Sequence, residues 1–271
     1  MAHSMLSPSG AHRWLACTPS AVLERQFPDQ GSDAAAEGTL AHELAELKLR
    51  NFFQAADFGK TKFTRAVNAL KRDPLWKDEM QGYTDTYLDY VKSLSLGFEN
   101  TPSAMVEKHI DLDMYIPSLP EEDPAGGTAD CILIGGGVLH IIDFKYGKGV
   151  PVSAEGNPQL SLYALGAYEA YKILYPIERI ELHIVQPRIS DEPSEWGCSL
   201  TELLAFGRRV KQRAALAIEG EGDYRPSKAN CRFCRAKATC RARAEKNAEL
   251  AFGPVGKKPP LISNEEMGKF L

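Results

Sequence analysis

Two acidic residues and a lysine lie in a pair of segments whose composition is typical of a β-hairpin. Residues 128–134 and 138–147 are rich in β-branched and aromatic side chains, and a run of three glycines separates them. If the last two glycines form a two-residue loop, Asp130 lies opposite Asp143, and both project from the same face as Lys145. A three-residue loop would shift this register by one residue.

This pair of carboxylates predicts a metal site. Two carboxylates that face each other across paired strands repel and destabilise the sheet. A divalent cation between them reverses the sign of that interaction, because hard oxygen ligands suit Mg²⁺ or Mn²⁺. The segment GTLAHELAE adds His42 on an expected helix, with Glu46 one turn later. A lone helical histidine is more often a packed or exposed side chain than a ligand, so His42 gains weight only from the company of Glu107 and the hairpin residues.

A further helix is expected directly after the hairpin, because Asn157 and Pro158 form an N-cap and first-turn pair. Gln159 and Tyr163, four residues apart, lie on one face of that helix and can pack near the metal site. The alternative interpretation is a polar cap and a half-buried tyrosine.

The six cysteines indicate a second metal site. No secretory signal is present, and in a reducing cytosol clustered thiols more often bind metal than form disulfides. Cys231-x2-Cys234-x5-Cys240 is a compact triad, and Cys17 can supply the fourth ligand of a tetrahedral site. Four thiolates suit both zinc and an iron–sulfur cluster, so the spacing leaves the metal open.

The charge of the chain is unevenly distributed. Its net charge of −4 argues weakly against nucleic acid, but residues 225–247 carry eight Lys or Arg against one acid, which leaves −11 on the remainder. A basic block around the cysteines predicts a phosphate-binding surface formed by Arg232, Arg235, Lys237 and Arg241. A solvated helix face is the alternative interpretation.

The remaining pattern predicts an α/β fold with a mixed central β-sheet flanked by helices and a Cys-clustered C-terminal segment. Helices are expected near residues 7–17, 34–53, 78–96, 158–174 and 200–218, and strands at 104–112, in the hairpin and at 179–188. Cys131 is expected in the core of the sheet, and Cys198 is expected to have no role at the cysteine site.

We expect one domain over residues 1–252, followed by a linker and the start of a truncated helix at 253–271. The first four residues resemble a cloning remnant. No apolar run reaches the length of a membrane span.

In combination, the motifs of residues 38–163 resemble those of RecB-like nucleases of the PD-(D/E)XK superfamily. The matching motifs, in order, are GTLAH ending at His42, Glu107, GTAD ending at Asp130, Asp143-Phe144-Lys145 and Gln159-x-x-x-Tyr163. The literal proline of the superfamily name is absent, because Ala129 precedes Asp130. The cysteines resemble the four-cysteine iron–sulfur staple of AddB-type and CRISPR-associated members.

The resemblance implies a restriction-endonuclease-like core and metal-dependent hydrolysis of DNA. His42, Asp130, Asp143 and the carbonyl of Phe144 would hold one or two Mg²⁺ or Mn²⁺ ions. Lys145 would stand beside the attacking water. Glu107 would bind a second ion or a water, and Gln159 and Tyr163 would position the DNA backbone or Lys145.

The resemblance also implies a setting and partners. It favours a [4Fe–4S] cluster over zinc, and it implies substrates with free ends, so that an exonuclease is expected more than an endonuclease. Stand-alone phage or prophage proteins that act in DNA recombination and repair are the most similar members. A cytoplasmic location in a bacterial or phage-infected cell is expected, with a helicase or a single-strand annealing protein as a possible partner. No Walker A sequence is present.

Two other functions stay open at this point. A catalytically silent module on the same fold could bind DNA ends or a partner protein, although intact Asp130, Asp143 and Lys145 argue against it. A zinc-stabilised scaffold without a nucleic-acid role would rest only on the cysteines and on the acidic remainder of the chain.

Overall fold

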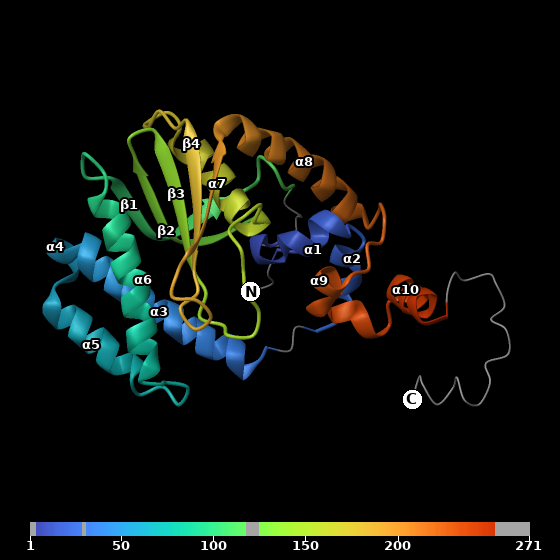
Figure 1. Cartoon of the computed structure of the whole chain (residues 1–271), viewed down its shortest axis with the longest axis horizontal. Helices are drawn as coiled ribbons and strands as arrows, with labels where there is room; N and C mark the ends of the chain where they lie inside the picture. Colours follow the sequence, from blue (N-terminus) through green and yellow to red (C-terminus); the bar gives the residue numbers. More distant parts are fainter. Residues whose placement is uncertain (1–3, 29–30, 118–124, 253–271) are drawn as a thin grey trace.

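The computed structural model describes residues 4–28, 31–117 and 125–252 and shows one five-stranded sheet with helices on both faces (Figure 1). The strands are β1 (Ser103–Asp111), β2 (Gly126–Gly135), β3 (Val138–Phe144), β4 (Arg179–Val185) and β5 (Ser194–Ser199). The helices are η1 (Pro8–Gly10), α1 (Ala11–Ala16), α2 (Ser20–Arg25), α3 (Asp33–Phe53), α4 (Ala55–Phe58), α5 (Lys60–Leu70), α6 (Glu79–Leu96), α7 (Pro158–Tyr171), α8 (Leu200–Glu219), α9 (Lys228–Arg232), η2 (Arg235–Ala238) and α10 (Arg241–Phe252).

The sheet is mixed, as the sequence predicts. Its strand order is β1-β2-β3-β4-β5, and β3 and β4 are parallel whereas the other neighbours are antiparallel. A parallel connection needs a crossover, and α7 supplies it between β3 and β4. The α/β prediction of a mixed sheet flanked by helices is therefore confirmed.

The hairpin of β2 and β3 has the register expected for a two-residue loop. Cys131 pairs with Ile142, and Gly135 pairs with Val138. The two glycines of the loop, at 136 and 137, have φ values of 55° and 79°. A tight hairpin turn of this kind needs positive φ at both central residues, which glycine adopts without steric cost. The next opposed positions beyond Cys131 and Ile142 are Asp130 and Asp143.

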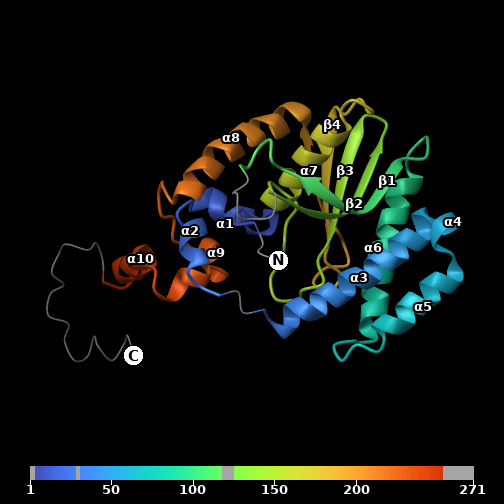
Figure 2. The ribbon, with the colours of Figure 1, turned by 180° about the vertical axis from the view of Figure 1, so that it is seen from behind.

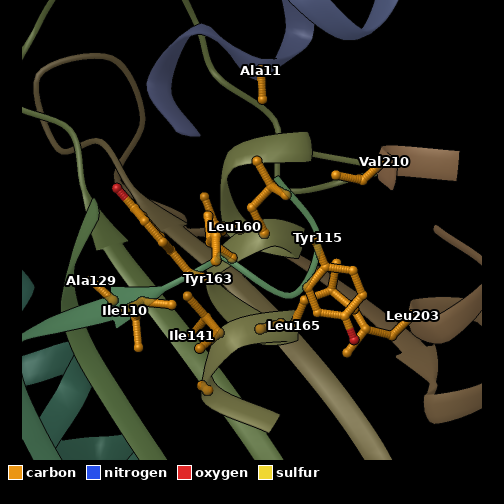
Figure 3. Close-up of a cluster of buried hydrophobic side chains, with 14 of the residues drawn as sticks. Ala11, Ile110, Tyr115, Ala129, Ile141, Leu160, Tyr163, Leu165, Leu203 and Val210 are labelled. Carbon is orange, nitrogen blue, oxygen red and sulfur yellow. The ribbon is translucent and has the colours of Figure 1, made fainter. Parts of the chain in front are cut away.

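Both faces of the sheet are covered, so its central strands are apolar on both sides. Leu133 and Ile142 pack with α3 and α6 on one face. Ile132 and Ile141 pack with α1, α7 and α8 on the other face, which Figure 3 shows around Leu160, Leu165 and Leu203. The candidate site residues of β2 and β3 described below lie just beyond Cys131 and Ile142, where the printed pairing of the two strands ends.

Local signals account for most helix boundaries. Asn157 caps α7, since its Oδ1 accepts hydrogen bonds from the backbone N–H groups of the next turn, and Ser199 and Glu202 form a capping box at α8. The predicted helix at 158–174 ends earlier, at Tyr171, and the predicted strand at 179–188 ends at Val185. At η1, Ser7 occupies the N-cap position in an extended conformation before Pro8, but its side chain makes no capping hydrogen bond.

Several elements have no counterpart in the sequence prediction, namely α2, α4, α5, β5 and α10. Cys131 is fully buried in the sheet, as predicted. The predicted linker and helix at 253–271 lie outside the described residues. Within the described part of the chain, none of the helices is long and apolar enough to cross a membrane.

Candidate functional site

The ends of β2 and β3 meet α3 at a cluster of titratable side chains. Nδ1 of His42, in the middle of α3, lies 3.3 Å from Oδ1 of Asp130. One ligand atom from each of His42, Glu107 and Asp130 lies within 4.8 Å of the other two. The second oxygen of Asp130 accepts a 2.7 Å hydrogen bond from the N–H of Phe144, which fixes the carboxylate. An imidazole and two carboxylates at this spacing form a donor set that suits Mg²⁺ or Mn²⁺.

Glu107 reaches this cluster through an unusual backbone conformation. Its φ is +48°, the single positive value outside glycine among the described residues. The residues on either side pair regularly with β2, Val106 with Cys131 and Lys108 with Ala129. A left-handed conformation in a non-glycine residue costs about 1 to 3 kcal/mol and is concentrated at functional sites. The strain at Glu107 therefore favours a functional role over a surface role.

A second group of side chains adjoins the first. Nζ of Lys145 lies 2.9 Å from Oδ2 of Asp143 and donates a 3.1 Å hydrogen bond to Oε1 of Gln159. Nε2 of Gln159 donates to the hydroxyl of Tyr163 at 3.4 Å. A Cβ at Gly127 would lie 3.0 Å from the Tyr163 ring, so a glycine at that place leaves room for the tyrosine. Gln159 thus holds the Lys145 ammonium, as the sequence predicts.

Asp143 has the environment expected of a group that awaits a cation. Its side chain is only 4% exposed, and Oδ2 accepts no well-formed hydrogen bond from any described residue although Nζ of Lys145 is near. Buried polar atoms in folded proteins almost always have a hydrogen-bond partner, and exceptions call for an explanation. A divalent ion at this end of the sheet would supply that partner, so the residues fit the metal that the sequence predicts. The closely spaced group of ligand atoms consists of His42, Glu107 and Asp130 and does not include Asp143.

The charges of the cluster shift several pKa values. Burial raises the pKa of Asp143 and the nearby Asp130 adds to this, while Lys145 opposes it. Burial acts to raise the pKa of Asp130, but His42, Lys145 and the N–H of Phe144 together outweigh it and lower the pKa of that carboxyl. The pKa values of His42 and Lys145 are both raised despite burial, because the two aspartates stabilise their cationic forms. Burial, Asp130 and Glu46 raise the pKa of Glu107 to about 7.

The raised pKa of Glu107 predicts a pH-dependent stability of the metal-free protein. The ordinary value is 4.5, so between that pH and about 7 the folded state binds more protons than the unfolded state, and stability falls as pH rises. In EDTA, the unfolding free energy of wild type is expected to fall from pH 5 to pH 8. That of Glu107→Gln is expected to fall by about 1 to 2 kcal/mol less over the same range. Denaturant unfolding at both pH values measures this, with the exposed Glu99→Gln as control. A variant whose pH profile parallels that of wild type would contradict the prediction.

The sequence prediction missed a residue that fixes the loop after Lys145. Gln186, which directly follows β4 and is 7% exposed, donates from Nε2 to the carbonyls of Gly147 and Val150 at 2.7 and 2.9 Å. Its Oε1 accepts a 3.0 Å hydrogen bond from the N–H of Val152. One buried amide therefore orders the chain between the hairpin and α7. A glutamine directly after the apolar pair Ile184 and Val185 was the available signal.

The predicted cysteine site is also assembled. Cys17, Cys231, Cys234 and Cys240 all line one cavity, although the first is more than two hundred residues from the others. All four are free thiols, so no disulfide competes for them. Cys198 lies elsewhere, on β5, and does not line this cavity. Four thiols that converge on one cavity fit a metal or an iron–sulfur cluster.

Glu24, which sequence analysis did not single out, joins the two ends of the chain at this cavity. It is 6% exposed, forms a 2.7 Å ion pair with Nε of Arg13, and accepts a 2.8 Å hydrogen bond from the N–H of Arg235. Arg213 of α8 also donates to the carbonyls of Leu15 and Ala16. Figures 1 and 2 both show α1 and α2 beside α9. These contacts hold Cys17 next to the C-terminal cysteines.

The basic residues predicted to bind DNA surround this cysteine cavity. Arg232, Arg235, Lys237 and Arg241 are all exposed. The guanidinium of Arg232 donates to the carbonyl of Gly149 at 3.4 Å, in the loop that Gln186 orders. The basic block is therefore in contact with the segment that follows Lys145.

Comparison with known proteins shows the family of this chain. Residues 3–271 match the profile of the family described as "Protein of unknown function (DUF2800)". The chain belongs to the DUF2800 family. This DUF2800 protein is also similar to the protein of the solved structure entitled "Crystal structure of SSO0001", with 16% sequence identity over 75% of this chain and 85% of that chain and a TM-score of 0.31. A likeness at that level supports no conclusion about fold or function.

Proposed function

We propose that this DUF2800 protein is a metal-dependent deoxyribonuclease of the RecB-like PD-(D/E)XK type that degrades DNA from free ends. The observation that carries the proposal is the juxtaposition of two groups from distant parts of the chain. His42, Glu107 and Asp130 form a ligand set, and Asp143 adjoins it with a paired Lys145. A surface cluster of acids has no reason to include a carboxylate as deeply buried as that of Asp143, which is 3% exposed.

Each side chain has a chemical task in phosphodiester hydrolysis. When bound, Mg²⁺ or Mn²⁺ would activate a water molecule and stabilise charge on the phosphate. His42, Glu107, Asp130 and Asp143 would hold the ion, with the Phe144 carbonyl as a further predicted ligand. Lys145 stays protonated, because its pKa is raised, and can neutralise charge on the scissile phosphate.

Gln159 and Tyr163 act through Lys145 rather than on the substrate. Gln159 accepts from Nζ of Lys145, and the Tyr163 hydroxyl accepts from the amide of Gln159. The chain of hydrogen bonds runs from α7 into the site and restricts the ammonium to one position. Positioning of this kind lowers the reorganisation that the site needs during the reaction.

The proposal includes a [4Fe–4S] cluster held by Cys17, Cys231, Cys234 and Cys240. Thiolates around a tetrahedral zinc would lie about 3.8 Å apart, given zinc–sulfur bonds of about 2.3 Å. Among the described residues, no three cysteine sulfurs lie within 4.8 Å of one another. In a [4Fe–4S] cluster each thiolate binds a different iron, which holds the sulfurs farther apart. The cluster is proposed from the resemblance of the cysteine pattern, and zinc is the alternative that metal analysis tests.

The biological setting proposed is DNA recombination or repair of a phage or prophage in the bacterial cytoplasm. The cluster would be structural, since it ties the two ends of the described chain and holds the basic block beside the loop after Lys145. A helicase or a single-strand annealing protein is the proposed type of partner.

A cleavage assay tests the proposed activity. End-labelled linear single- and double-stranded DNA is incubated with purified protein whose cysteine site is filled, with Mn²⁺, with Mg²⁺ or with EDTA. We expect metal-dependent degradation whose product ladder gives the polarity, loss of it in Asp143→Asn, and wild-type activity in the exposed Asp89→Asn on α6. DNA binding without cleavage would overturn the nuclease proposal in favour of a silent DNA-end-binding module.

A further inference from the structure

Helix α5 carries a concentration of positive charge that neither the metal cluster nor the cysteine site uses. Residues 59–72 contain five Lys or Arg and no acid, a net charge of +5 in a chain whose total is −4. None of the described ion pairs involves Lys60, Arg65 or Arg72. Lys62 and Lys71 lie over the rings of Phe58 and Trp76. These three exposed cations therefore have no acidic partner among the side chains that the structure describes.

The unpaired cations line one hollow together with neutral donors. An open hollow of about 550 Å³ lies along the helix and is lined by Lys60, Thr64, Arg65, Asn68 and Arg72. All five side chains are exposed and can donate hydrogen bonds. At a rise of 1.5 Å per residue, α5 extends about 15 Å from Lys60 to Leu70, and Arg72 follows just beyond its end, so these cations span several successive phosphates of a nucleic-acid strand.

The opposite, apolar side of α5 packs against the rest of the protein. Val67 and Leu70 contact the core cluster under α3 and α6, while α5 has no fully buried residue. The apolar side is therefore not available for insertion into a lipid surface, which an amphipathic membrane helix needs. Ala69 is the one apolar side chain in the hollow, whereas the centre of a protein interface is normally rich in aromatic and apolar groups.

From this donor set we infer that the Lys60–Arg72 face of α5 binds the phosphate backbone of a polynucleotide. Lysine, arginine, threonine and asparagine are the residues that contact phosphates without reading sequence. Helix α5 and the basic block at 225–247 lie at opposite ends of the long axis of the molecule, with α3 and the ends of β2 and β3 between them (Figures 1 and 2). The inference rests on the proposed action on DNA. It assigns to α5 a second DNA-binding surface, at the other end of the molecule from the cysteine site.

Salt-dependent binding tests this inference without cleavage. Binding of a 30-base-pair DNA duplex and of a 30-nucleotide single strand is measured in EDTA over a series of salt concentrations. The triple variant Lys60→Ala/Arg65→Ala/Arg72→Ala is compared with wild type and with Arg208→Ala/Arg209→Ala/Lys211→Ala. The control removes the same charge from exposed positions of α8, on the other face of the sheet. Alanine at exposed helical positions preserves the helix.

We expect the α5 variant to lower the slope of log affinity against log salt by about 2 to 3, since each lost phosphate contact removes about 0.7 to 0.9. The α8 control should keep the wild-type slope within about 0.5.

Equal slopes in all three proteins would overturn the inference and leave an acidic protein as the partner of α5. Cleavage of DNA by the same samples would still support the nuclease proposal. Wild-type protein that binds neither nucleic acid would overturn the DNA-binding part of both. An altered slope without any cleavage in wild type would support the inference and overturn the nuclease.

Discussion

Replacing Lys145 with methionine is expected to reduce the rate of DNA cleavage about 100- to 1,000-fold, the effect of removing one preorganised group that stabilises charge in a transition state. Methionine keeps an unbranched apolar stem of similar length and removes the ammonium. Lys145 is held between Asp143 and Gln159, so its Nζ has a fixed place beside the ligand cluster. DNA binding in EDTA should stay within about threefold of wild type, because one phosphate contact among many is lost.

The same substitution should change stability in a pH-dependent way. Lys145 is the cation that offsets burial of Asp143, whose pKa is already raised. Without the ammonium the pKa of Asp143 rises further, so the folded state binds its proton more tightly than the unfolded state does. The metal-free variant is therefore destabilised as pH rises through that pKa and recovers as pH falls. Removing one partner of a buried ion pair costs about 3 to 5 kcal/mol when the other stays charged, and the partial exposure of Lys145 places this case at or below the lower end.

Two further variants separate catalysis from stability. Asp143→Asn/Lys145→Met should recover most of the lost unfolding free energy and stay inactive, because it leaves no unpaired buried charge. Lys148→Met, at an exposed position of the following loop, should behave as wild type in both measurements. If Lys145→Met cleaves DNA at the wild-type rate, Lys145 is a structural partner of Asp143 and has no part in the reaction.

The sequence predicts the hairpin and its register because both depend on local chemistry. Two glycines that adopt positive φ define the loop, and alternation then fixes which side chains share a face. The same holds for α7, where the Asn157 cap sets the helix start and places Gln159 and Tyr163. Residues whose positions follow from short-range rules can therefore be assigned to the site in advance.

Other features depend on contacts between distant segments and give little local signal. The left-handed conformation of Glu107 is not a property of its neighbours in sequence, because surrounding structure must impose such strain. Glu24 looks like an ordinary helical surface acid until Arg13 and Arg235 are brought to it. Helix α5 has no counterpart in the sequence prediction because a cationic segment with three large apolar residues is also typical of a solvent-exposed loop. Strand β5 is short and largely polar, as expected at a sheet edge.

Replacing Cys234 with serine is expected to remove the bound cluster and to lower the free energy of unfolding by about 4 kcal/mol or more. A cross-link between residue 17 and the 231–240 segment closes a loop of over two hundred residues, and cross-links of long loops stabilise by about this amount in the chain-entropy description. Serine has nearly the size of cysteine but offers a hard hydroxyl in place of a thiolate, which suits neither iron–sulfur clusters nor zinc. Non-covalent contacts such as those of Glu24 and Arg213 would then hold this region together.

Cys198→Ser is the matched control for this experiment. Both cysteines are 8% exposed, but Cys198 does not line the cavity that the other four share. Each substitution replaces one buried thiol with a hydroxyl, so the cost of burying that hydroxyl is common to both variants. Iron, sulfide and zinc content, visible absorption and unfolding are measured for anaerobically purified wild type and for both variants. About four irons and four sulfides per chain in wild type and in Cys198→Ser, with loss in Cys234→Ser, would establish the cluster, whereas one zinc would replace it with the alternative metal. Equal metal content and equal stability in the two variants would exclude Cys234 as a ligand, and the convergence of the four thiols would then be a matter of packing alone.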